Sequence, residues 1–342
     1  MPELPEVQHA VNLLISVGAK KRICKVDTTE DSLVFAQTTP EQFAAEIVGR
    51  TIQHVHRYGK LFYLELDGEG KVPVLHFGMT GKLQVKGKDP MQYQSSSRDA
   101  HNIWPPRYAK FILHLANDDS DGTVEVAFVD MRRLGRIRLC MSPKNESPIS
   151  ELGFDPILSM PTLDDFLPAV RRRTCPAKVL LLDQSFSAGV GNWIADEVLY
   201  NARIHPEQRC NTLTHAQISS LHHFVVTICE TAVAVDADSQ RFPAHWLFRH
   251  RWGKGRKKKM NTLTLEPNGE PATVKWITVG GRTSAYVVEL QQLPSHLMNP
   301  DPVDPDGDGD IRSGTPPGQA DAPTTDNDPD GTQRRGRKRR RK

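Results

Sequence analysis

The feature that most constrains the fold of this chain is a series of eight short β-forming segments that begins at about residue 22 and reaches past residue 139. The segments are rich in Val, Ile, Leu, Phe and Tyr, and Gly, Asp and Asn separate them, a pattern typical of strands joined by tight turns. In chain order they read RICKVDTT, TIQHVHRYG, KLFYLEL, VPVLHFG, KLQVKG, AKFILHL, VEVAFVD and RIRLCM. Strands in this number predict a two-sheet β-sandwich or a barrel.

Helical patterns flank these strands on both sides. Residues 5–17 begin with Pro and an acid and then place five apolar side chains at helical spacing, which predicts a buried first helix. These side chains are Val7, Ala10, Val11, Leu14 and Ile15. Past residue 143 the chain predicts four helices, TLDDFLPAVRRR, PAKVLLLDQ, NWIADEVLYNAR and THAQISSLHHFVVTICETAVAV, with the small residues of SFSAGVGN between the second and the third. Residues 274–290 predict two short strands around a Gly-Gly-Arg turn.

These patterns predict an α+β protein with a tail. An N-terminal β-sandwich domain is expected over residues 1–142, a mostly helical domain over residues 143–240 and a region with a β-hairpin finger over residues 241–293. Residues 294–342 are rich in Pro, Asp, Gly, Thr and Ser and end in the basic run RRGRKRRRK. Such a composition cannot bury enough apolar surface to offset the entropy of ordering, so this tail is predicted to be disordered.

Charge, cysteine content and hydropathy narrow the class of protein. The formal net charge is only +3, so a nucleic-acid partner would have to meet a local cluster of basic residues. The five cysteines lie far apart without a C-x-x-C pair, which predicts reduced thiols in an intracellular compartment. No stretch reaches the roughly 18 to 20 apolar residues of a membrane span, so no membrane partner is expected.

The N-terminal sequence MPELPEV places a reactive amine beside two carboxylates. Removal of the initiator Met would expose the secondary amine of Pro2, and an α-amino group titrates near pH 7.7 to 8.0 against about 10.4 for lysine. Attack of this amine on an aldehyde-level carbon gives an iminium, which can act as an electron sink for elimination. Glu3 and Glu6 lie within one helical turn and could protonate a leaving base. The alternative is that PELPE is only an acidic helix start, stabilised by the helix dipole.

Six motifs in chain order carry a family resemblance. They are MPELPEV, RYGKLFYLEL, HFGMTGKL, DMRRLGRIR, GVGNWIADEVLYNARIHP and VGGRTSAYVVELQ, and they extend from residue 2 to about residue 293. The sequence resembles the formamidopyrimidine-DNA glycosylase and endonuclease VIII family of bifunctional DNA glycosylases. The resemblance implies a helix-two-turns-helix element in the helical domain and a DNA cleft between the two domains.

The resemblance implies catalytic roles for four residues. Pro2 matches the nucleophile, Glu3 matches the general acid that assists base loss and ring opening, and Glu6 matches a residue that supports the sugar. Lys60 lies in a predicted β-hairpin turn and matches a residue that binds the phosphate next to the lesion. The alternative for Lys60 is a solvated surface lysine.

Three side chains match the residues that fill the gap left by a flipped base. Base flipping costs a few kcal/mol of unstacking energy and leaves the opposite base unpaired. Met79 would wedge between the bases, Arg132 would hydrogen-bond the widowed base, and Leu134 departs from the aromatic residue common in bacterial members. The alternative for the Met and the Leu is a place in a sheet core.

Two more positions match phosphate-binding residues of the family. Asn192 directly follows GVG, so its side chain and the free N–H groups of a helix start could hold a phosphate. An ordinary N-cap is compatible with this role. Arg282 would bind lesion phosphates from the hairpin turn, a contact that orients DNA without reading its sequence.

The C-terminal region departs from bacterial members of the family, which end in a four-cysteine zinc finger. No Cys follows residue 240, so zinc cannot be held in that way, and VGGRTSAYVVELQQL resembles the zincless finger of the plant and fungal branch. His245 and His250 are spaced like ligands, but two ligands do not close a site. No metal or organic cofactor is therefore expected. The basic cluster at residues 254–259 either tracks the DNA backbone or is a solvated loop.

The implied function is a bifunctional DNA glycosylase and abasic-site lyase of base excision repair. It would remove oxidised bases through a Pro2 Schiff base and cut the strand by β,δ-elimination. The segment DADSQRFPAHWLF is expected to be too short to cap 8-oxoguanine, so formamidopyrimidines, hydantoins and abasic sites are expected to be better substrates. The expected partner is double-stranded DNA with an oxidised base or an abasic site, bound by a monomer.

The protein is expected in the nucleus, and two alternative functions remain to be weighed. The terminal basic run and the need for a Pro2 terminus, which leaves no place for a cleaved targeting peptide, predict residence in the nucleus. A non-catalytic damaged-DNA-binding protein on the same fold would predict the loss of Pro2, Glu3 or Lys60, and all three are present. A helix-two-turns-helix module that binds RNA or protein leaves the N-terminal domain unexplained.

Overall fold

The first half of the chain folds into two antiparallel sheets of four strands each. The computed structural model describes residues 2–88, 103–117, 122–252, 263–265 and 269–294. The strands are β1 Arg22–Thr28, β2 Ile52–Tyr58, β3 Leu61–Leu66, β4 Val72–His76, β5 Lys82–Val85, β6 Ala109–Ala116, β7 Thr123–Val129 and β8 Arg136–Cys140. One sheet has the order β1-β6-β7-β5 and the other the order β2-β3-β4-β8. All eight predicted strands are confirmed, as is the α+β class.

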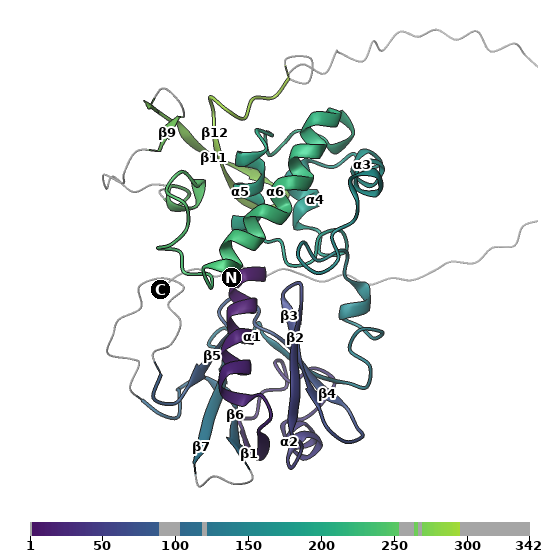
Figure 1. Cartoon of the computed structure of the whole chain (residues 1–342), viewed down its shortest axis with the longest axis vertical. Coiled ribbons are helices and arrows are strands. Elements are labelled where there is room, and N and C mark those ends of the chain that lie inside the picture. Colours follow the sequence, from purple (N-terminus) through teal and green to yellow (C-terminus); the bar gives the residue numbers. More distant parts are fainter. Residues whose placement is uncertain (1, 89–102, 118–121, 253–262, 266–268, 295–342) are drawn as a thin grey trace, which may run out of the picture. The chain divides into compact units, whose positions relative to one another are not determined.

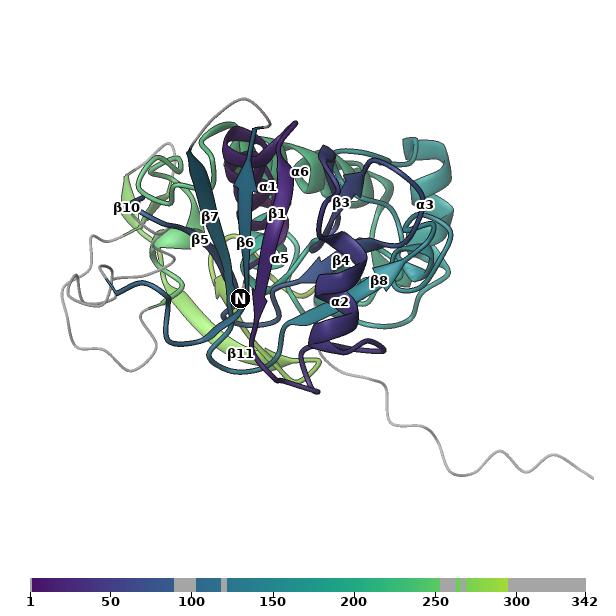
Figure 2. The same ribbon diagram turned by 90° about the horizontal axis from the view of Figure 1, so that it is seen from below.

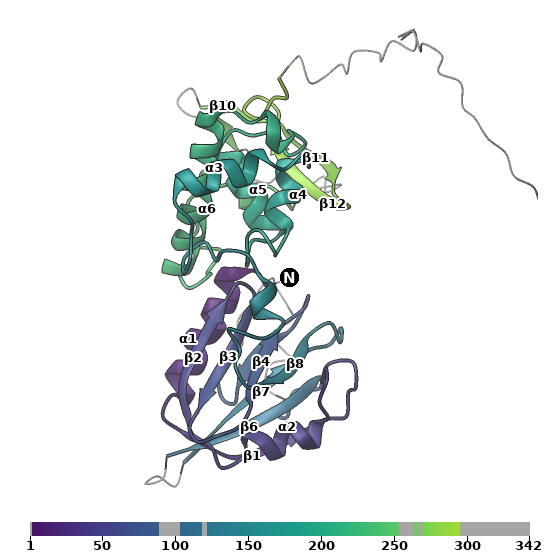
Figure 3. The same ribbon diagram turned by 90° about the vertical axis from the view of Figure 1, so that its right-hand side faces the viewer.

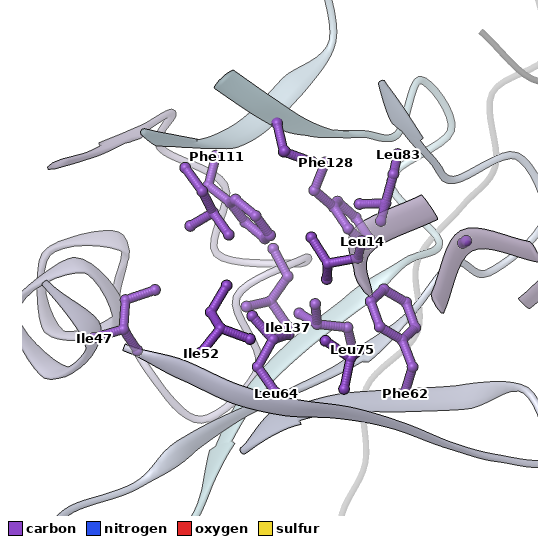
Figure 4. Packing of buried hydrophobic residues seen from close by; sticks show 14 of the residues in the cluster. Leu14, Ile47, Ile52, Phe62, Leu64, Leu75, Leu83, Phe111, Phe128 and Ile137 are labelled. Atoms are coloured by element: carbon purple, nitrogen blue, oxygen red, sulfur yellow. The ribbon is translucent and has the colours of Figure 1, made fainter. Parts of the chain in front are cut away.

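Side chains from both sheets meet in one apolar core, which makes the pair of sheets a sandwich. Figure 4 shows Phe111, Phe128 and Leu83 of one sheet facing Phe62 and Leu75 of the other. Leu14 and Ile47 enter the same core from the two helices of this half. Successive side chains of a strand point to opposite faces of its sheet, so alternate residues of each strand face this core.

Helix α1, Leu4–Gly18, begins the described chain and packs against β2 and β3 and against the later helix α6 (Figure 1). Its buried face contains Val7, Ala10, Val11 and Leu14, as predicted. Ile15 was expected on that face and is 44% exposed, so this part of the prediction is wrong. Ile15 follows Leu14 by about 100° of helix rotation and therefore falls outside the stripe that contacts the sheet.

Helix α2, Pro40–Ile47, was not predicted and lies against β1 and β4 (Figure 2). Thr39 caps it, since the Thr39 hydroxyl accepts a hydrogen bond from Gln42 N and the Gln42 side chain accepts one from Thr39 N. Pro40 at the first helical position favours the same start. The sequence therefore contained a capping signal for this helix, although only Phe43 and Ile47 follow it into the core.

The second half of the described chain is helical, with a hairpin. Its helices are α3 Leu163–Arg171, α4 Ala177–Leu182, α5 Asn192–Asn201 and α6 His215–Ala234, together with the short 3-10 helices η2 Ile149–Glu151, η3 Cys210–Thr212 and η4 Leu247–Arg249. Its strands are β9 Thr264–Leu265, β10 Glu270–Pro271, β11 Val274–Val279 and β12 Arg282–Val287. Strand β12 packs on α5 (Figure 3). The four predicted helices and the hairpin of β11 and β12 are confirmed. The predicted tail, residues 294–342, lies outside the described residues apart from Pro294.

The helical half has its own apolar core. Its buried side chains come from α3 to α6 and the segment after α6, together with Leu4 of α1. None of the helices in the described parts of the chain is long and apolar enough to cross a bilayer.

Buried Glu197 of α5 fixes the segment that leads to the hairpin. Its two carboxylate oxygens accept hydrogen bonds from Leu247 N at 3.0 Å and from Phe248 N at 2.7 Å. Burial raises the pKa of Glu197 to about 8, against the tendency of these hydrogen bonds and of Arg251 to lower it. At neutral pH the Glu197 carboxyl is therefore protonated in most molecules.

We expect Glu197 to make the folded state less stable as the pH rises. The folded-state pKa lies above the unfolded value of 4.5, so the contribution is fully present below pH 4.5 and is lost as the pH rises through about 8. At about 1.4 kcal/mol per pKa unit, the loss is at most about 5 kcal/mol. Urea unfolding of the wild type and of Glu197→Gln at pH 5 and pH 8.5 measures this loss. The free energy of unfolding of the variant is subtracted from that of the wild type at each pH, so the effects of other titrating groups such as His76 cancel. Exposed Glu230→Gln should give a difference independent of pH, and the same flat result for Glu197→Gln would contradict the expectation.

Candidate active site

The predicted catalytic residues of the N-terminus lie at the start of α1 and are buried. Pro2 precedes Glu3, the residue that caps α1, and Glu3 N donates to Glu6 Oε2 at 3.0 Å. Leu4 N donates to Gly189 O at 3.1 Å, which attaches the N-terminus to the GVG segment. The sequence motifs MPELPEV and GVGN therefore meet in space.

The Glu3 carboxylate binds the N-terminus of α5. Glu3 Oε1 accepts from Trp193 N at 2.9 Å and Glu3 Oε2 accepts from Ile194 N at 3.1 Å. A side chain at Gly191 could not fit, because a Cβ there would lie 2.2 Å from Glu3 Cδ. A carboxylate at this place satisfies backbone donors that have no partner within the helix and faces the positive end of the helix dipole.

This contact corrects the expectation for Asn192. Gly191 is the N-cap and Asn192 is the first helical residue, and two of the N–H groups expected to be free for a phosphate are bound to Glu3. The Asn192 amide donates to Thr283 O at 3.0 Å, which connects α5 to the hairpin strand β12. A phosphate contact therefore stays a prediction for the Asn192 side chain. It is no longer expected for the two N–H groups that are bound to Glu3.

Glu6 is the second buried carboxyl of the site. Its Oε1 accepts from the indole Nε1 of Trp193 at 3.1 Å, while its Oε2 accepts from Glu3 N. Burial, and next the negative charge of Glu3, raise the pKa of Glu6 to about 7. Glu6 can therefore both hold and release a proton near neutral pH, as a general acid or base must.

Lys60 reaches the same site from the turn between β2 and β3. Its Nζ donates to Val190 O at 2.9 Å, and the residue is half-buried, so the alternative of a solvated surface lysine is wrong. Burial lowers the pKa of Lys60, the charges of Glu3 and Glu6 oppose this change, and the charge of Arg282 adds to it. The turn itself needs Gly59, which has a φ of +57° and whose Cβ would lie 2.9 Å from Ala188 Cβ.

A buried ion pair holds the Lys60 turn in place. Arg57 and Asp155 contact each other at 1% and 0% side-chain exposure. Asp155 Oδ2 also accepts from Gly59 N at 2.8 Å, and Arg57 Nε donates to Gln8 Oε1 at 2.9 Å. The pair therefore connects α1, the Lys60 turn and the segment before α3.

Met79, Arg132 and Leu134 lie in two loops that touch. Gly78 has a φ of +62°, and a Cβ there would lie 2.3 Å from the carbonyl group of Leu134. Asp130 holds both loops, since it accepts from Thr80 Oγ1 at 3.2 Å and from Gly135 N at 2.6 Å. Arg132 and Leu134 are exposed and Met79 is half-buried, so the alternative of a place in a sheet core is wrong.

The same loop contains one exposed apolar residue that the sequence analysis did not consider. Met131 is 56% exposed, against 40% for Leu134. Its position in DMRRLG, directly before Arg132, was the only signal available. Arg133 instead turns back to the buried Asp31, with its Nε 3.0 Å from Asp31 Oδ2.

Arg282 is exposed at the first position of β12 and pairs with Val279 across the turn. Gly280 and Gly281 form this turn with φ values of +56° and +72°. A Cβ at Gly280 would lie 2.7 Å from Val179 Cγ2, so the turn is packed on α4. The predicted Gly-Gly-Arg hairpin is thereby confirmed.

A buried charge network that the sequence analysis missed places the start of α5. Asp196 contacts Lys178 of α4 and accepts from Arg251 Nη2 at 2.5 Å. Lys178 Nζ also donates to Asn192 O at 2.8 Å, and Ala285 N donates to Asp196 at 3.3 Å. The acid within NWIADE was a sequence signal for such a role, but its partners are 18 and 55 residues away.

The residues singled out as metal ligands do not form a group with a third ligand in the described parts of the chain. His245 and His250 belong to no group of three His, Cys, Asp or Glu side chains close enough to hold a metal there. The basic cluster at residues 254–259 lies outside the described residues. One group of three does occur on β2 and β3, and it is described below.

A β-sandwich followed by a helical domain with this N-terminal site defines a known class, and the chain matches two family models in the same order. The first is described as the formamidopyrimidine-DNA glycosylase N-terminal domain and covers residues 1–137. The second is described as the formamidopyrimidine-DNA glycosylase H2TH domain and covers residues 152–244. The chain belongs to the formamidopyrimidine-DNA glycosylase family.

Individual relatives agree with this assignment. A formamidopyrimidine-DNA glycosylase of Arabidopsis thaliana is 40% identical over 293 residues, which are 86% of this chain and 71% of that protein. One from Pelotomaculum thermopropionicum is 34% identical over 238 residues, 68% of this chain and 78% of that protein. The family of this chain therefore includes eukaryotic as well as bacterial relatives.

Solved structures share the fold. Lactococcus lactis formamidopyrimidine-DNA glycosylase, non-covalently bound to DNA that contains an abasic site, superposes with a TM-score of 0.65. It is 24% identical, and the match covers 85% of this chain and all of that chain. A structure named MutM, in complex with DNA containing carbocyclic 8-oxo-G, gives 0.66 at 23% identity over 85% of this chain and 100% of that chain.

Proposed function

We propose that the chain is a DNA glycosylase and abasic-site lyase of base excision repair that uses the Pro2 amine as its nucleophile. The observation that supports this most is the arrangement of Glu3, which caps α1 directly after Pro2 and binds the N-terminus of α5. Glu3 directly follows the amine that removal of Met1 would expose, Glu6 accepts from Glu3 N, and the charges of both carboxyls act on Lys60. The proposed partner is double-stranded DNA with an oxidised base or an abasic site.

In the proposed reaction the Pro2 nitrogen attacks C1′ of the damaged nucleotide. The bond from C1′ to the base breaks, and Glu3 or Glu6 supplies the proton that the leaving base takes up. The C1′–O4′ bond then breaks and O4′ takes up a proton, which opens the sugar ring and leaves an iminium between C1′ and the Pro2 nitrogen. This iminium accepts the electron pair released when a C2′ proton is removed, and the 3′ phosphate leaves. Loss of a second proton expels the 5′ phosphate, so both ends of the nick carry phosphates.

The remaining residues would position the DNA. Lys60 and Arg282 offer positive charge beside the site, where the side-chain amide of Asn192 could add a phosphate contact. Met79, Arg132 and Leu134 lie on two touching loops and would replace the flipped base. A Leu in the third place offers no ring for stacking on the partner base, so that contact should be weaker than an aromatic one.

We also propose three features of the whole chain. The domain bounds are residues 1–142, 143–240 and 241–293. The first division is supported by two apolar cores, one formed by residues before 142 and one formed, apart from Leu4, by residues after 142. The protein acts as a monomer in the nucleus, and the basic run at residues 334–342 supports the nuclear location. Fusion of this run to a fluorescent protein tests that location.

Borohydride trapping on an abasic-site duplex tests the nucleophile. The protein with its Met removed is expected to form a covalent adduct, because borohydride reduces the iminium to a stable amine. A preparation with a blocked N-terminus should form none, and Pro2→Gly, which keeps only a primary amine, should form less. Failure of the processed protein to form an adduct, although it binds the duplex, would instead favour the non-catalytic damaged-DNA-binding alternative.

We expect the enzyme to excise formamidopyrimidines and hydantoins faster than 8-oxoguanine. The segment after α6 is held by its own packing, with the rings of Phe242 and Trp246 centred 5.5 and 6.4 Å from that of Trp193. Little of it is therefore free to close over an 8-oxoguanine base. Single-turnover excision from duplexes that differ only in the lesion measures this preference, and comparable rates on 8-oxoguanine and a hydantoin would contradict it.

A further inference from the structure

Two histidines and a glutamate form a cluster on the solvent-facing side of the β2–β3 hairpin. Strands β2 and β3 are antiparallel, with His54 opposite Glu65 and His56 opposite Tyr63. Side chains two residues apart lie on one face of a strand, so His54, His56 and Glu65 share a face. Their side chains are 60%, 37% and 52% exposed. The neighbours Val55 and Leu64 point into the sandwich core.

The donor atoms of this cluster are close enough to bind one ion. His56 Nε2 lies 2.7 Å and His54 Nδ1 lies 3.3 Å from the same oxygen, Glu65 Oε2, and the ligand atoms of the three residues all lie within 4.8 Å of one another. A tetrahedral ion with bonds of about 2.0 to 2.1 Å separates its ligands by roughly 3.4 Å. Small side-chain rotations would therefore bring all three atoms to bonding distance.

The surroundings of the cluster favour the binding geometry. The His56 ring is stacked on Tyr63, with centroids 4.8 Å apart and planes at 27°, which limits its rotation. Glu65 Oε2 already lies close to both rings, 2.7 Å from His56 Nε2 and 3.3 Å from His54 Nδ1. The site thus presents one anionic oxygen and two imidazole nitrogens before an ion arrives.

We propose that His54, His56 and Glu65 bind a divalent transition-metal ion of the zinc type, with water at the fourth position. Imidazole nitrogen suits Zn²⁺, Cu²⁺ and Ni²⁺, whereas Mg²⁺ and Ca²⁺ require oxygen ligands. Two imidazoles and one carboxylate are a ligand set that zinc accepts with an open position. The ion would join β2 to β3 in the hairpin that carries Lys60 at its turn.

Titration of the full, untagged and metal-free chain with Zn²⁺ tests the proposal. One equivalent should bind, and a thermal scan should show a higher melting temperature with Zn²⁺ than without it, because an ion that binds the folded state stabilises it. His56→Gln and Glu65→Gln should each weaken binding by about tenfold or more, a loss known even for residues that only orient ligands. Co²⁺ used in place of Zn²⁺ should give visible absorption that the same substitutions remove.

The neighbouring sheet offers a matched control. His114 Nε2 lies 2.6 Å from Asp27 Oδ2 on β6 and β1, a pair of the same chemistry that belongs to no group of three ligands in the described chain. His114→Gln should therefore leave the Zn²⁺ affinity and the Co²⁺ spectrum unchanged. Absence of saturable Zn²⁺ binding, or binding that survives both His56→Gln and Glu65→Gln, would overturn the proposal. Neither result depends on glycosylase activity.

Discussion

Glu3→Gln is expected to slow base excision by about 10²- to 10⁴-fold, the usual contribution of a positioned general acid. Glutamine keeps the size of Glu3 but cannot donate a proton as an acid or carry a negative charge. The measurement is single-turnover excision from a formamidopyrimidine duplex. Adduct formation on an abasic duplex should fall less, because that substrate has already lost its base.

The structural role of Glu3 must be separated from its chemical one. Its carboxylate accepts from Trp193 N and Ile194 N, and an amide oxygen can replace only one of the two acceptors. An unsatisfied buried N–H costs about 1 to 3 kcal/mol, so thermal unfolding has to accompany the kinetics. Exposed Glu230→Gln on α6 serves as the matched control and should change neither. An excision rate within threefold of wild type in a folded Glu3→Gln protein would mean that Glu3 only holds the N-terminus of α5 in place.

The strands and long helices followed from local pattern, whereas one short helix did not. Runs of β-forming residues bounded by turn residues identified each of the eight strands. Helix α2 has eight residues, too few for a repeating apolar stripe, and only its capping residues Thr39 and Gln42 marked it. Ile15 was predicted to be buried but is exposed. Helical spacing indicates that a helix has an apolar stripe, but it does not give the width of the stripe that is buried.

Motifs named the residues of the candidate site, whose roles stay predictions, but the contacts between these residues could not be predicted from the sequence. Pro2, Glu3 and Lys60 were identified from motifs, yet nothing local indicates that Glu3 binds an N–H group 190 residues away. Buried charges such as Asp196 and Lys178 were missed for the same physical reason. A charge is buried only when a partner compensates it, and that partner is supplied by the tertiary fold.

Asp155→Ala is expected to destabilise the folded protein by about 3 to 5 kcal/mol, the cost of leaving a buried charge without its partner. The substitution leaves the Arg57 guanidinium, whose side chain is 1% exposed, without its carboxylate partner, and it removes the acceptor of Gly59 N. For a protein of this size the loss corresponds to a melting temperature roughly 4 to 8 °C lower. Thermal and urea unfolding measure it, and exposed Asp164→Ala should change stability by less than about 1 kcal/mol.

A double variant distinguishes the two parts of this cost. Arg57→Met with Asp155→Leu removes both charges, and replacing a buried ion pair by apolar residues is often neutral. Asp155 also accepts from Gly59 N, Ile157 N and Leu158 N, however, and these three donors stay without it in the double variant. We therefore expect the double variant to recover only the part that comes from the stranded guanidinium. Full recovery would mean that the three N–H bonds contribute little, and no recovery would mean that they, and not the ion pair, hold the Lys60 turn in place.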